Sequence, residues 1–452
     1  MNNGTRSPTD RRTGAGAAIG RPERNLESLA DTESVHFPEG FLWGVATAAH
    51  QVEGGNTLND WWVAETAGRL PASGRASGHW ERFEKDFDLV RSWHNTAHRF
   101  SVEWSRIEPE AGKWSDAALG HYSDVVDALR VRGLEPVLTL HHFTNPAWFA
   151  NRGGWLSRDA PTLFARFVER VVDSLGDRVR WWLTVNEPTV WAKHAFVIGD
   201  WPPFERGRWI RAGRAIRAML RAHEAAYRVI HARQPDARVG FAHSAAWVEP
   251  CRRERMCDRA VARIRDFMLN GAVFRMIGAG SRGAPLDFIG INYYSRTIVR
   301  HGWRGAGTIF GVECTHDHHH GSRRWSDMGW EIHARGLLHV LRQFSSYGLP
   351  LLVTENGLAT DDEELRCQVL SEHLSALAAA VEERLDVRGY FYWALVDNYE
   401  WALGMHPHFG LAAMDPATLD RLPRPAAHLF AAVCERNAVP KGGISTSPSA
   451  SG

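Results

Sequence analysis

The sequence predicts an α/β fold consisting of a single (β/α)8 barrel. Eight short apolar runs alternate with amphipathic helical stretches, and no Pro- or Ser-rich linker separates them. Eight such units favour one closed barrel over a doubly wound sheet. The length of 452 residues agrees, because barrels with long loops extend from about 250 to beyond 400 residues. In this fold the active site lies at the C-terminal ends of the strands.

The expected strands are runs rich in Val, Ile, Phe, Trp and Leu, which suit the buried wall of a barrel. In chain order they cover residues 41–45, 97–102, 136–141, 181–186, 238–243, 288–292, 351–355 and 389–394. The helices between them carry apolar residues at three- and four-residue steps. This pattern is clearest at 117–130, 159–174, 211–233 and 362–384.

The two ends of the chain differ in composition from its body. The first 24 residues are basic and lack the apolar core of a secretory signal, while the last 16 are mainly Gly, Ser and Pro. We expect a disordered leader over 1–35, one folded domain over 36–436 and a disordered tail over 437–452. The five cysteines form no CxxC pair, which favours free thiols and a cytoplasmic protein.

Charge and motifs exclude several classes of partner. The chain has 53 Lys and Arg against 52 Asp and Glu, with Arg scattered along it, so neither nucleic acid nor a membrane is indicated as a partner. No dinucleotide fingerprint and no P-loop are present. The histidine run at 316–320 lacks the spacing of a metal site. We therefore expect no cofactor and no metal, and the sequence gives no indication of the oligomeric state.

Two glutamates end predicted strands in distinctive strings. Glu187 stands in Thr-Val-Asn-Glu-Pro at 184–188, and Glu355 stands in Val-Thr-Glu-Asn-Gly at 353–357. Both carboxylates should therefore lie at the C-terminal face of the barrel. Cleavage of a glycosidic bond needs such a pair, because one carboxyl group protonates the leaving oxygen and the other attacks or stabilises the anomeric carbon. The 20 Trp and 20 Phe residues also offer apolar faces that suit sugar rings.

Eight stretches then show a resemblance to a known family. They are FPEGFLWGVATAAHQVEGG at 37–55, HRFSVEWSRIEP at 98–109, LTLHHFTNPAWF at 138–149, LTVNEPTVW at 183–191, DFIGINYYS at 287–295, DMGWEI at 327–332, VTENGL at 353–358 and GYFYWALVDNYEWALGMHPHFGL at 389–411. Over about residues 36 to 436 the chain resembles glycoside hydrolase family 1, the β-glucosidase and β-galactosidase group. The resemblance implies a small-molecule β-glycoside as substrate.

The resemblance implies an exo-acting, retaining double displacement. Glu355 matches the nucleophile that forms a covalent glycosyl-enzyme, and Glu187 matches the general acid/base, which needs a raised pKa. Arg99 and Tyr294 match residues that contact the nucleophile, and Asn292 matches one that supports the region around it. A retaining pair should have carboxyl groups about 5–5.5 Å apart.

The resemblance also implies a binding site for the sugar. Gln51 and His142 match residues that hydrogen-bond its hydroxyl groups, and Asn186 matches the amide that holds the 2-hydroxyl.

Four further residues complete that site by resemblance. Trp393 matches the platform under the ring, and Trp401 matches a further contact. Glu400 matches the acceptor for the 4- and 6-hydroxyls. Trp330 matches an aromatic residue on the leaving-group side. A carboxylate at position 400 disfavours a 6-phosphate. We therefore expect a β-glucosidase, with β-galactosidase and β-fucosidase activity as alternatives.

Three positions depart from the family pattern. Phe143 stands where most members have Trp, and His50 replaces the usual Tyr or Ser. Glu103 either pairs with Arg106 or faces a polar part of the barrel. A transglycosidase with the same residues and a catalytically weak sugar-binding barrel remain as alternative functions.

Overall fold

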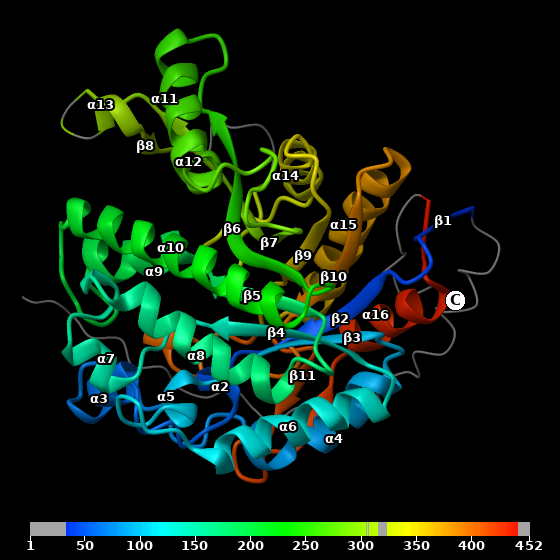
Figure 1. Cartoon of the computed structure of the whole chain (residues 1–452). Coiled ribbons are helices and arrows are strands. Elements are labelled where there is room, and N and C mark those ends of the chain that lie inside the picture. Colours follow the sequence, from blue (N-terminus) through cyan, green and yellow to red (C-terminus); the bar gives the residue numbers. More distant parts are fainter. Residues whose placement is uncertain (1–32, 304, 306, 315–322, 442–452) are drawn as a thin grey trace, which may run out of the picture.

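The computed structural model describes residues 33–303, 305, 307–314 and 323–441. Within this part of the chain, eight parallel strands close into a barrel, as predicted (Figure 1). They are β2 (Leu42–Ala46), β3 (Ala97–Ser101), β4 (Glu135–His141), β5 (Trp181–Asn186), β6 (Arg238–Pro250), β7 (Ile289–Arg300), β9 (Leu351–Asn356) and β10 (Val387–Trp393). Pairing of β10 with β2 and of β6 with β7 completes the ring.

Helices surround the barrel and cover its outer face (Figure 1). The long ones are α4 (His79–Ser92), α6 (Asp116–Val131), α8 (Ala160–Leu175), α10 (Trp209–Arg233), α14 (Arg335–Ser345), α15 (Glu363–Glu382) and α16 (Pro425–Arg436). Short helices lie in the connections: α2 (Ala49–Val52), α3 (Asp60–Thr66), α5 (Trp104–Ile107), α7 (Ala147–Asn151) and α9 (Pro188–Lys193). Polar caps begin several of them; Ser115, for example, accepts from Ala118 N at the start of α6.

Side chains alternate between the two faces of the barrel wall, because a strand has a period of two. One set of buried residues, including Leu42, Val137 and Phe391, forms a cluster distinct from the larger one that packs the strands against the helices. Space within the wall is limiting at Gly44, where an added Cβ would lie 2.6 Å from the carbonyl oxygen of Ala97 and 2.7 Å from the Phe391 ring. A side chain there would displace a neighbouring strand.

Strands β6 and β7 are longer than predicted. Beyond the barrel they remain paired from Trp247 with Arg296 to Pro250 with Val299, and β8 (Val312–Glu313) adds antiparallel to β7. This extension carries α11 (Met256–Asp266), a π-helical turn (Phe267–Gly271), α12 (Ala272–Met276) and α13 (Gly307–Phe310), which project from the body in Figure 1. This extension was not predictable from the sequence, because each strand continues as a mixed polar segment.

The ends of the folded domain meet in a small sheet. Strand β1 (Ser34–His36) pairs antiparallel with β13 (Ala438–Pro440), so both strands lie partly or wholly outside the expected boundaries at 36 and 436. Strands β11 (Ala412–Met414) and β12 (Arg421–Pro423) form a second pair. Residues 1–32 of the expected leader, residues 442–452 of the expected tail and the histidine run at 316–320 lie outside the described residues. In the described part of the chain, no helix is long and apolar enough to cross a membrane.

Candidate active site

Glu355 lies near the C-terminal end of β9 and is held by a cation and a phenol. Its Oε1 accepts from Arg99 Nη1 at 2.5 Å, and its Oε2 accepts from Tyr294 Oη at 2.7 Å. Arg99, on β3, is fully buried and also donates to Asn186 Oδ1 at 2.8 Å and to the carbonyl of Thr354 at 3.0 Å. The guanidinium thus lies in a fixed position beside the Glu355 carboxylate and forms a charge-assisted hydrogen bond with it.

Glu187 directly follows β5 and has a different environment. Its backbone is left-handed, with φ 44° and ψ 59°, and it caps helix α9, which begins at Pro188. Its Oε1 accepts from Asn292 Nδ2 at 2.8 Å, and none of the described cations forms an ion pair with it. Burial, reinforced by the charge of Glu355, raises the pKa of Glu187 to about 8. At neutral pH this carboxyl group therefore carries a proton.

Asn292 forms hydrogen bonds with Thr354, the residue before Glu355, and with Glu187. Its backbone lies opposite Glu355 in the β7–β9 ladder, yet its amide donates to Glu187 and, at 3.2 Å, to Asn186. Its Oδ1 accepts from Thr354 Oγ1 at 2.6 Å, which fixes the orientation of the amide. Asn292 therefore positions Glu187 directly.

Asn186 and His142 form a polar pair beside the carboxylates. Because Asn186 Oδ1 accepts from Arg99 and Asn292, its Nδ2 must donate to His142 Nε2, 3.1 Å away. Burial lowers the pKa of His142 well below its usual range, so the ring is neutral and its proton lies on Nδ1. That buried Nδ1 has no partner among the described residues.

Gln51 differs from His142 in that an acceptor atom, not a donor, lacks a partner. Its Nε2 donates to Asn398 Oδ1 and to the carbonyl of Tyr399, both at 2.9 Å, and to Glu400 Oε2 at 3.2 Å. Its buried Oε1 has no partner within the described part of the chain. Burial, with the charge of Glu355, raises the pKa of Glu400 to about 8. Among the described residues, the site thus offers His142 Nδ1 as a donor without a partner and Gln51 Oε1 as an acceptor without one. The Glu400 carboxyl group can both donate and accept when it is protonated.

Aromatic rings surround these polar groups. Trp393 and Trp401 are each stacked with His142, at centroid distances of 5.9 and 6.0 Å. The centroid of the Trp330 ring lies 5.3 Å from that of Tyr294, whose hydroxyl group donates to Glu355. The glycine of the Glu-Asn-Gly string is required here, because a Cβ on Gly357 would lie 1.9 Å from the carbonyl oxygen of Trp393.

Direct contacts therefore bring the predicted residues together in two groups. The first comprises Glu187, Glu355, Arg99, Asn292, Tyr294, Asn186, His142, Trp330, Trp393 and Trp401, and the second Gln51 and Glu400. Trp401, which directly follows Glu400, also stacks with His50, the residue before Gln51, and so links the groups. The sequence reasoning missed four supporting residues, Thr139, Ser244, Thr354 and Asn398. Thr139, Thr354 and Asn398 lie inside strings that carry the family resemblance, at 138–149, 353–358 and 389–411, whereas Ser244 lies in none of them.

The departures from the family pattern take buried positions around Trp401. Phe143 packs edge-on against Trp401 at 5.1 Å, and His50 stacks with it at 6.1 Å. His50 also forms a buried pair with Glu65, at 3.0 Å between Nε2 and Oε1. Both residues therefore act on the site by positioning the Trp401 ring.

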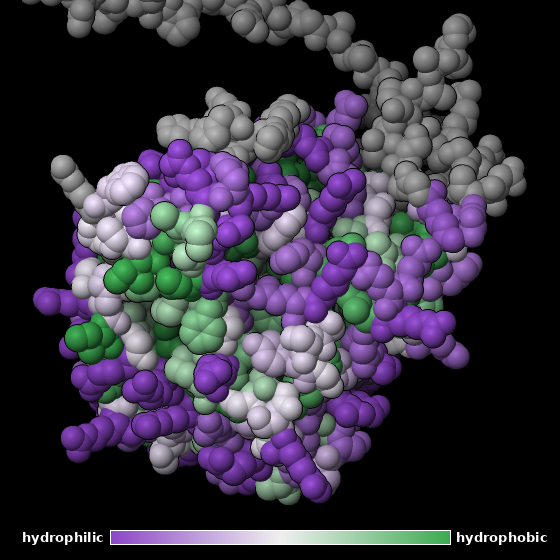
Figure 2. All heavy atoms as spheres, turned by 90° about the horizontal axis from the view of Figure 1, so that it is seen from above, coloured by the Kyte–Doolittle hydropathy of each residue, from purple (hydrophilic) through white to green (hydrophobic). Residues whose placement is uncertain are grey.

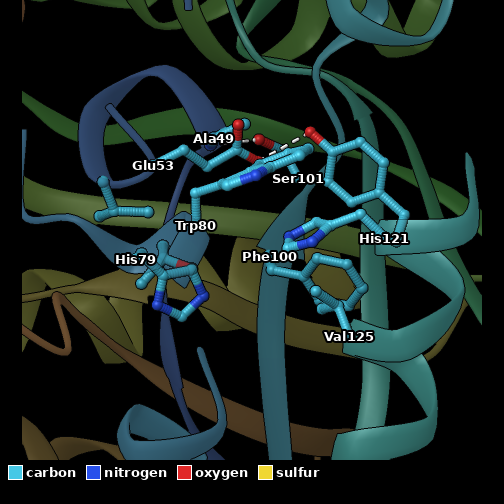
Figure 3. A pocket seen from close by; sticks show the side chains of 11 residues that line it. Ala49, Glu53, His79, Trp80, Phe100, Ser101, His121 and Val125 are labelled. Atoms are coloured by element: carbon cyan, nitrogen blue, oxygen red, sulfur yellow. Dashed lines mark hydrogen bonds between the residues drawn. The ribbon is translucent and has the colours of Figure 1, made fainter. Parts of the chain in front are cut away.

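Glu103 does not pair with Arg106. Its carboxylate accepts from Ser105 Oγ at 2.7 Å and from Thr144 Oγ1 at 2.8 Å, whereas Arg106 binds Glu53 at 2.9 Å. Glu53 also accepts from Tyr122 Oη at 2.7 Å, beside a small pocket between the barrel and helices α4 and α6 (Figure 3). This pocket contains none of the predicted site residues.

Comparison with known proteins agrees with this geometry. The model of glycosyl hydrolase family 1 matches residues 33–282 and 281–439. The thermostable β-glucosidase B of Thermobispora bispora is 32% identical over 90% of this chain and 92% of its own, and the β-glucosidase A of Thermotoga maritima is 29% identical over 89% and 98%.

Solved structures show the same fold. A β-glycosidase from Pyrococcus horikoshii superposes with a TM-score of 0.84 at 36% identity, over 91% of this chain and 97% of that chain. The β-glucosidase from Thermotoga maritima in complex with deoxynojirimycin superposes with a TM-score of 0.82 at 29% identity, over 89% and 99%. The chain therefore belongs to glycosyl hydrolase family 1 and is a β-glycosidase.

Proposed function

We propose that this β-glycosidase is a retaining, exo-acting enzyme that acts best on unphosphorylated β-glucosides. The observation that carries the proposal is the unequal environment of the two carboxyl groups. Glu355 contacts a guanidinium and a phenolic donor, whereas burial raises the pKa of Glu187 to about 8. One group is suited to be a nucleophile and the other to be an acid.

In the first step, a Glu355 oxygen attacks the anomeric carbon while the bond to the leaving oxygen breaks. Glu187 gives its proton to that oxygen, and the sugar becomes an ester of Glu355. The ester carries no charge, so one cause of the raised pKa of Glu187 disappears. Glu187 then accepts a proton from water, whose oxygen attacks the same carbon. Two inversions leave the β-configuration unchanged.

The polar groups around the carboxylates support a sugar as the ligand. The buried His142 Nδ1 is a donor without a partner among the described residues, and Gln51 Oε1 is such an acceptor. A buried group of this kind is stabilised when a ligand completes its hydrogen bond, and adjacent sugar hydroxyls both donate and accept. Two of the matched relatives are named as β-glucosidases, which supports glucose.

Glu400 affects the choice of sugar differently from the sequence expectation. With its pKa raised to about 8, the group is largely protonated at neutral pH. The neutral Glu400 carboxyl group therefore repels a 6-phosphate only weakly. It still disfavours a 6-phosphate, because it supplies no positive charge to bind one. We place the enzyme in the cytoplasm, which is supported by the absence of any CxxC pair among the five cysteines of the sequence.

Hydrolysis of a panel of p-nitrophenyl β-glycosides tests the activity, with Glu187→Gln and Glu355→Gln as inactive controls. The proposal expects release of p-nitrophenol, fastest from the glucoside, and loss of release in both variants. NMR of the first product should show the β-anomer. Initial formation of the α-anomer would refute the retaining mechanism.

A second measurement identifies the nucleophile. A 2-deoxy-2-fluoro glycoside with a good leaving group should accumulate as an ester, and peptide mass spectrometry should locate it on Glu355. Addition of an alcohol acceptor separates hydrolysis from transfer: free sugar as the only product contradicts a transglycosidase. A folded protein that releases nothing from any sugar would overturn the proposal in favour of a sugar-binding barrel.

A further inference from the structure

The extension of β6 and β7 holds a helical insert, defined here as residues 252–282 with helices α11 and α12. It stands at the same end of the barrel as Glu187 and Glu355, because both strands continue past the level of the carboxylates. The eight steps from Asn292 to Arg300 span roughly 26 Å in an extended strand. The insert is thus the part of the molecule that projects farthest above the site in Figure 1.

Helix α11 has two apolar faces, and only one of them is covered. Val261 and Ala262 are buried in a cluster with Val299 of β7. On the opposite side, Met256, Ile264 and Phe267 are 76%, 39% and 47% exposed. Their spacing of eight and three residues places them on one side of the helix. Met268 and Met276 are also about half exposed. An apolar helical face of this kind is typical of a binding surface.

The same insert concentrates positive charge. Residues 252–282 contain eight arginines and three acidic residues, although the whole chain is nearly neutral. Three arginines are used internally, in the pairs Arg252–Asp258, Arg253–Glu249 and Arg265–Glu313. The others are exposed and form no ion pair with any residue that the structure describes: Arg255, Arg259, Arg263, Arg275 and Arg282. Figure 2, viewed from this end of the molecule, shows apolar side chains gathered among hydrophilic ones.

We propose that the helical insert docks onto the surface of an anionic phospholipid bilayer. Arginines beside exposed Phe, Ile and Met side chains are the features of a helix that lies in a membrane interface, with its apolar residues among the acyl chains and its cations at the headgroups. Each arginine near an anionic surface strengthens binding about fivefold. A second copy of the insert is a poor occupant, because two strongly basic faces repel each other. The proposal is independent of the substrate.

Flotation with lipid vesicles tests the electrostatic part. The full chain should float with phosphatidylcholine vesicles that contain phosphatidylserine, not with phosphatidylcholine alone, and high salt should release it. Arg259→Glu combined with Arg263→Glu should reduce binding by about tenfold or more. The matched control, Lys85→Glu with Arg91→Glu on α4, makes the same charge change on a distant helix and should leave binding unchanged. Equal flotation of both double variants would overturn the proposal.

A second pair of variants tests insertion of the apolar face. Ile264→Ser with Phe267→Ser should weaken vesicle binding at least tenfold, because two apolar side chains are lost that the bilayer would otherwise bury. Val131→Ser with Leu422→Ser removes apolar residues elsewhere that are more exposed than Ile264 and Phe267, and it should have no effect. All variants should hydrolyse a soluble aryl glycoside at the wild-type rate, which shows that they fold.

Three further results would overturn the inference. One is a wild-type protein that does not float with anionic vesicles. Another is vesicle binding that survives loss of Ile264 and Phe267 unchanged. The third is a dimer in solution that the Ile264 and Phe267 variant converts to a monomer, since a second copy would then cover this face.

Discussion

Replacing the two active-site glutamates by glutamine should change the stability of the protein in opposite directions. Glu187→Gln removes a carboxyl group whose ionised form is disfavoured by burial, and its amide oxygen can still accept from Asn292. Glu355→Gln removes the counter-charge of the fully buried Arg99. We expect both variants to be inactive, so their stability and not their activity distinguishes the two environments.

The pKa of Glu187 sets the size of the first effect. Below its ordinary pKa of 4.5 the group is neutral in both states. Between pH 4.5 and about 8 the unfolded chain releases the proton while the folded protein keeps it, so the free energy of unfolding falls by on the order of 5 kcal/mol over this window. Glutamine does not titrate. Above pH 8 we therefore expect Glu187→Gln to be more stable than the wild type by up to that amount, or about 6 °C in Tm for roughly 400 ordered residues.

Arg99 sets the size of the second effect. Without Glu355 a buried guanidinium faces a neutral amide, and breaking a buried ion pair in this way costs about 3–5 kcal/mol. Thermal unfolding of the wild type and both variants between about pH 5 and about pH 9 measures both effects. The reasoning would be refuted by a Glu187→Gln variant that melts below the wild type at alkaline pH, or by a Glu355→Gln variant that melts above it.

Three further predictions concern catalysis. The value of kcat/KM should fall on the alkaline side with an apparent pKa near 8, because Glu187 must be protonated in the first step; a limb that ends well below neutral pH would contradict this assignment. Tyr294→Phe should lower kcat/KM by about ten- to a hundredfold in steady-state assays, because it removes a hydrogen bond to the charged Glu355, and an unchanged value would exclude a catalytic contribution. Asn292→Ala should move the alkaline limb of the pH profile upward, because the Asn292 amide favours ionised Glu187; a downward shift would show that this contact acts otherwise.

Much of the fold was predictable because it depends on local patterns. The eight runs of apolar residues match the eight barrel strands, to within a few residues in all but β6 and β7, and the helices near 117–130 and 362–384 begin at polar caps. The ion-pair partner of Arg106 was not predictable in the same way. The nearby Glu103 bonds to Thr144, while Arg106 binds Glu53 in the neighbouring connection, 53 residues earlier in the chain. Contacts between distant segments override proximity in the sequence.

The sequence by itself determined the barrel, the family and the pair of carboxylates, because strand periodicity places residues that end strands at one face. Only the tertiary structure decided which carboxyl group is buried without a cation, and that Asn292 contacts Glu187. It alone showed that His142 Nδ1 and Gln51 Oε1 lack partners among the described residues, and that a basic, apolar insert stands above the site. The physical reason is that pKa values and hydrogen bonds depend on distance and burial, which arise when residues far apart in the chain come together.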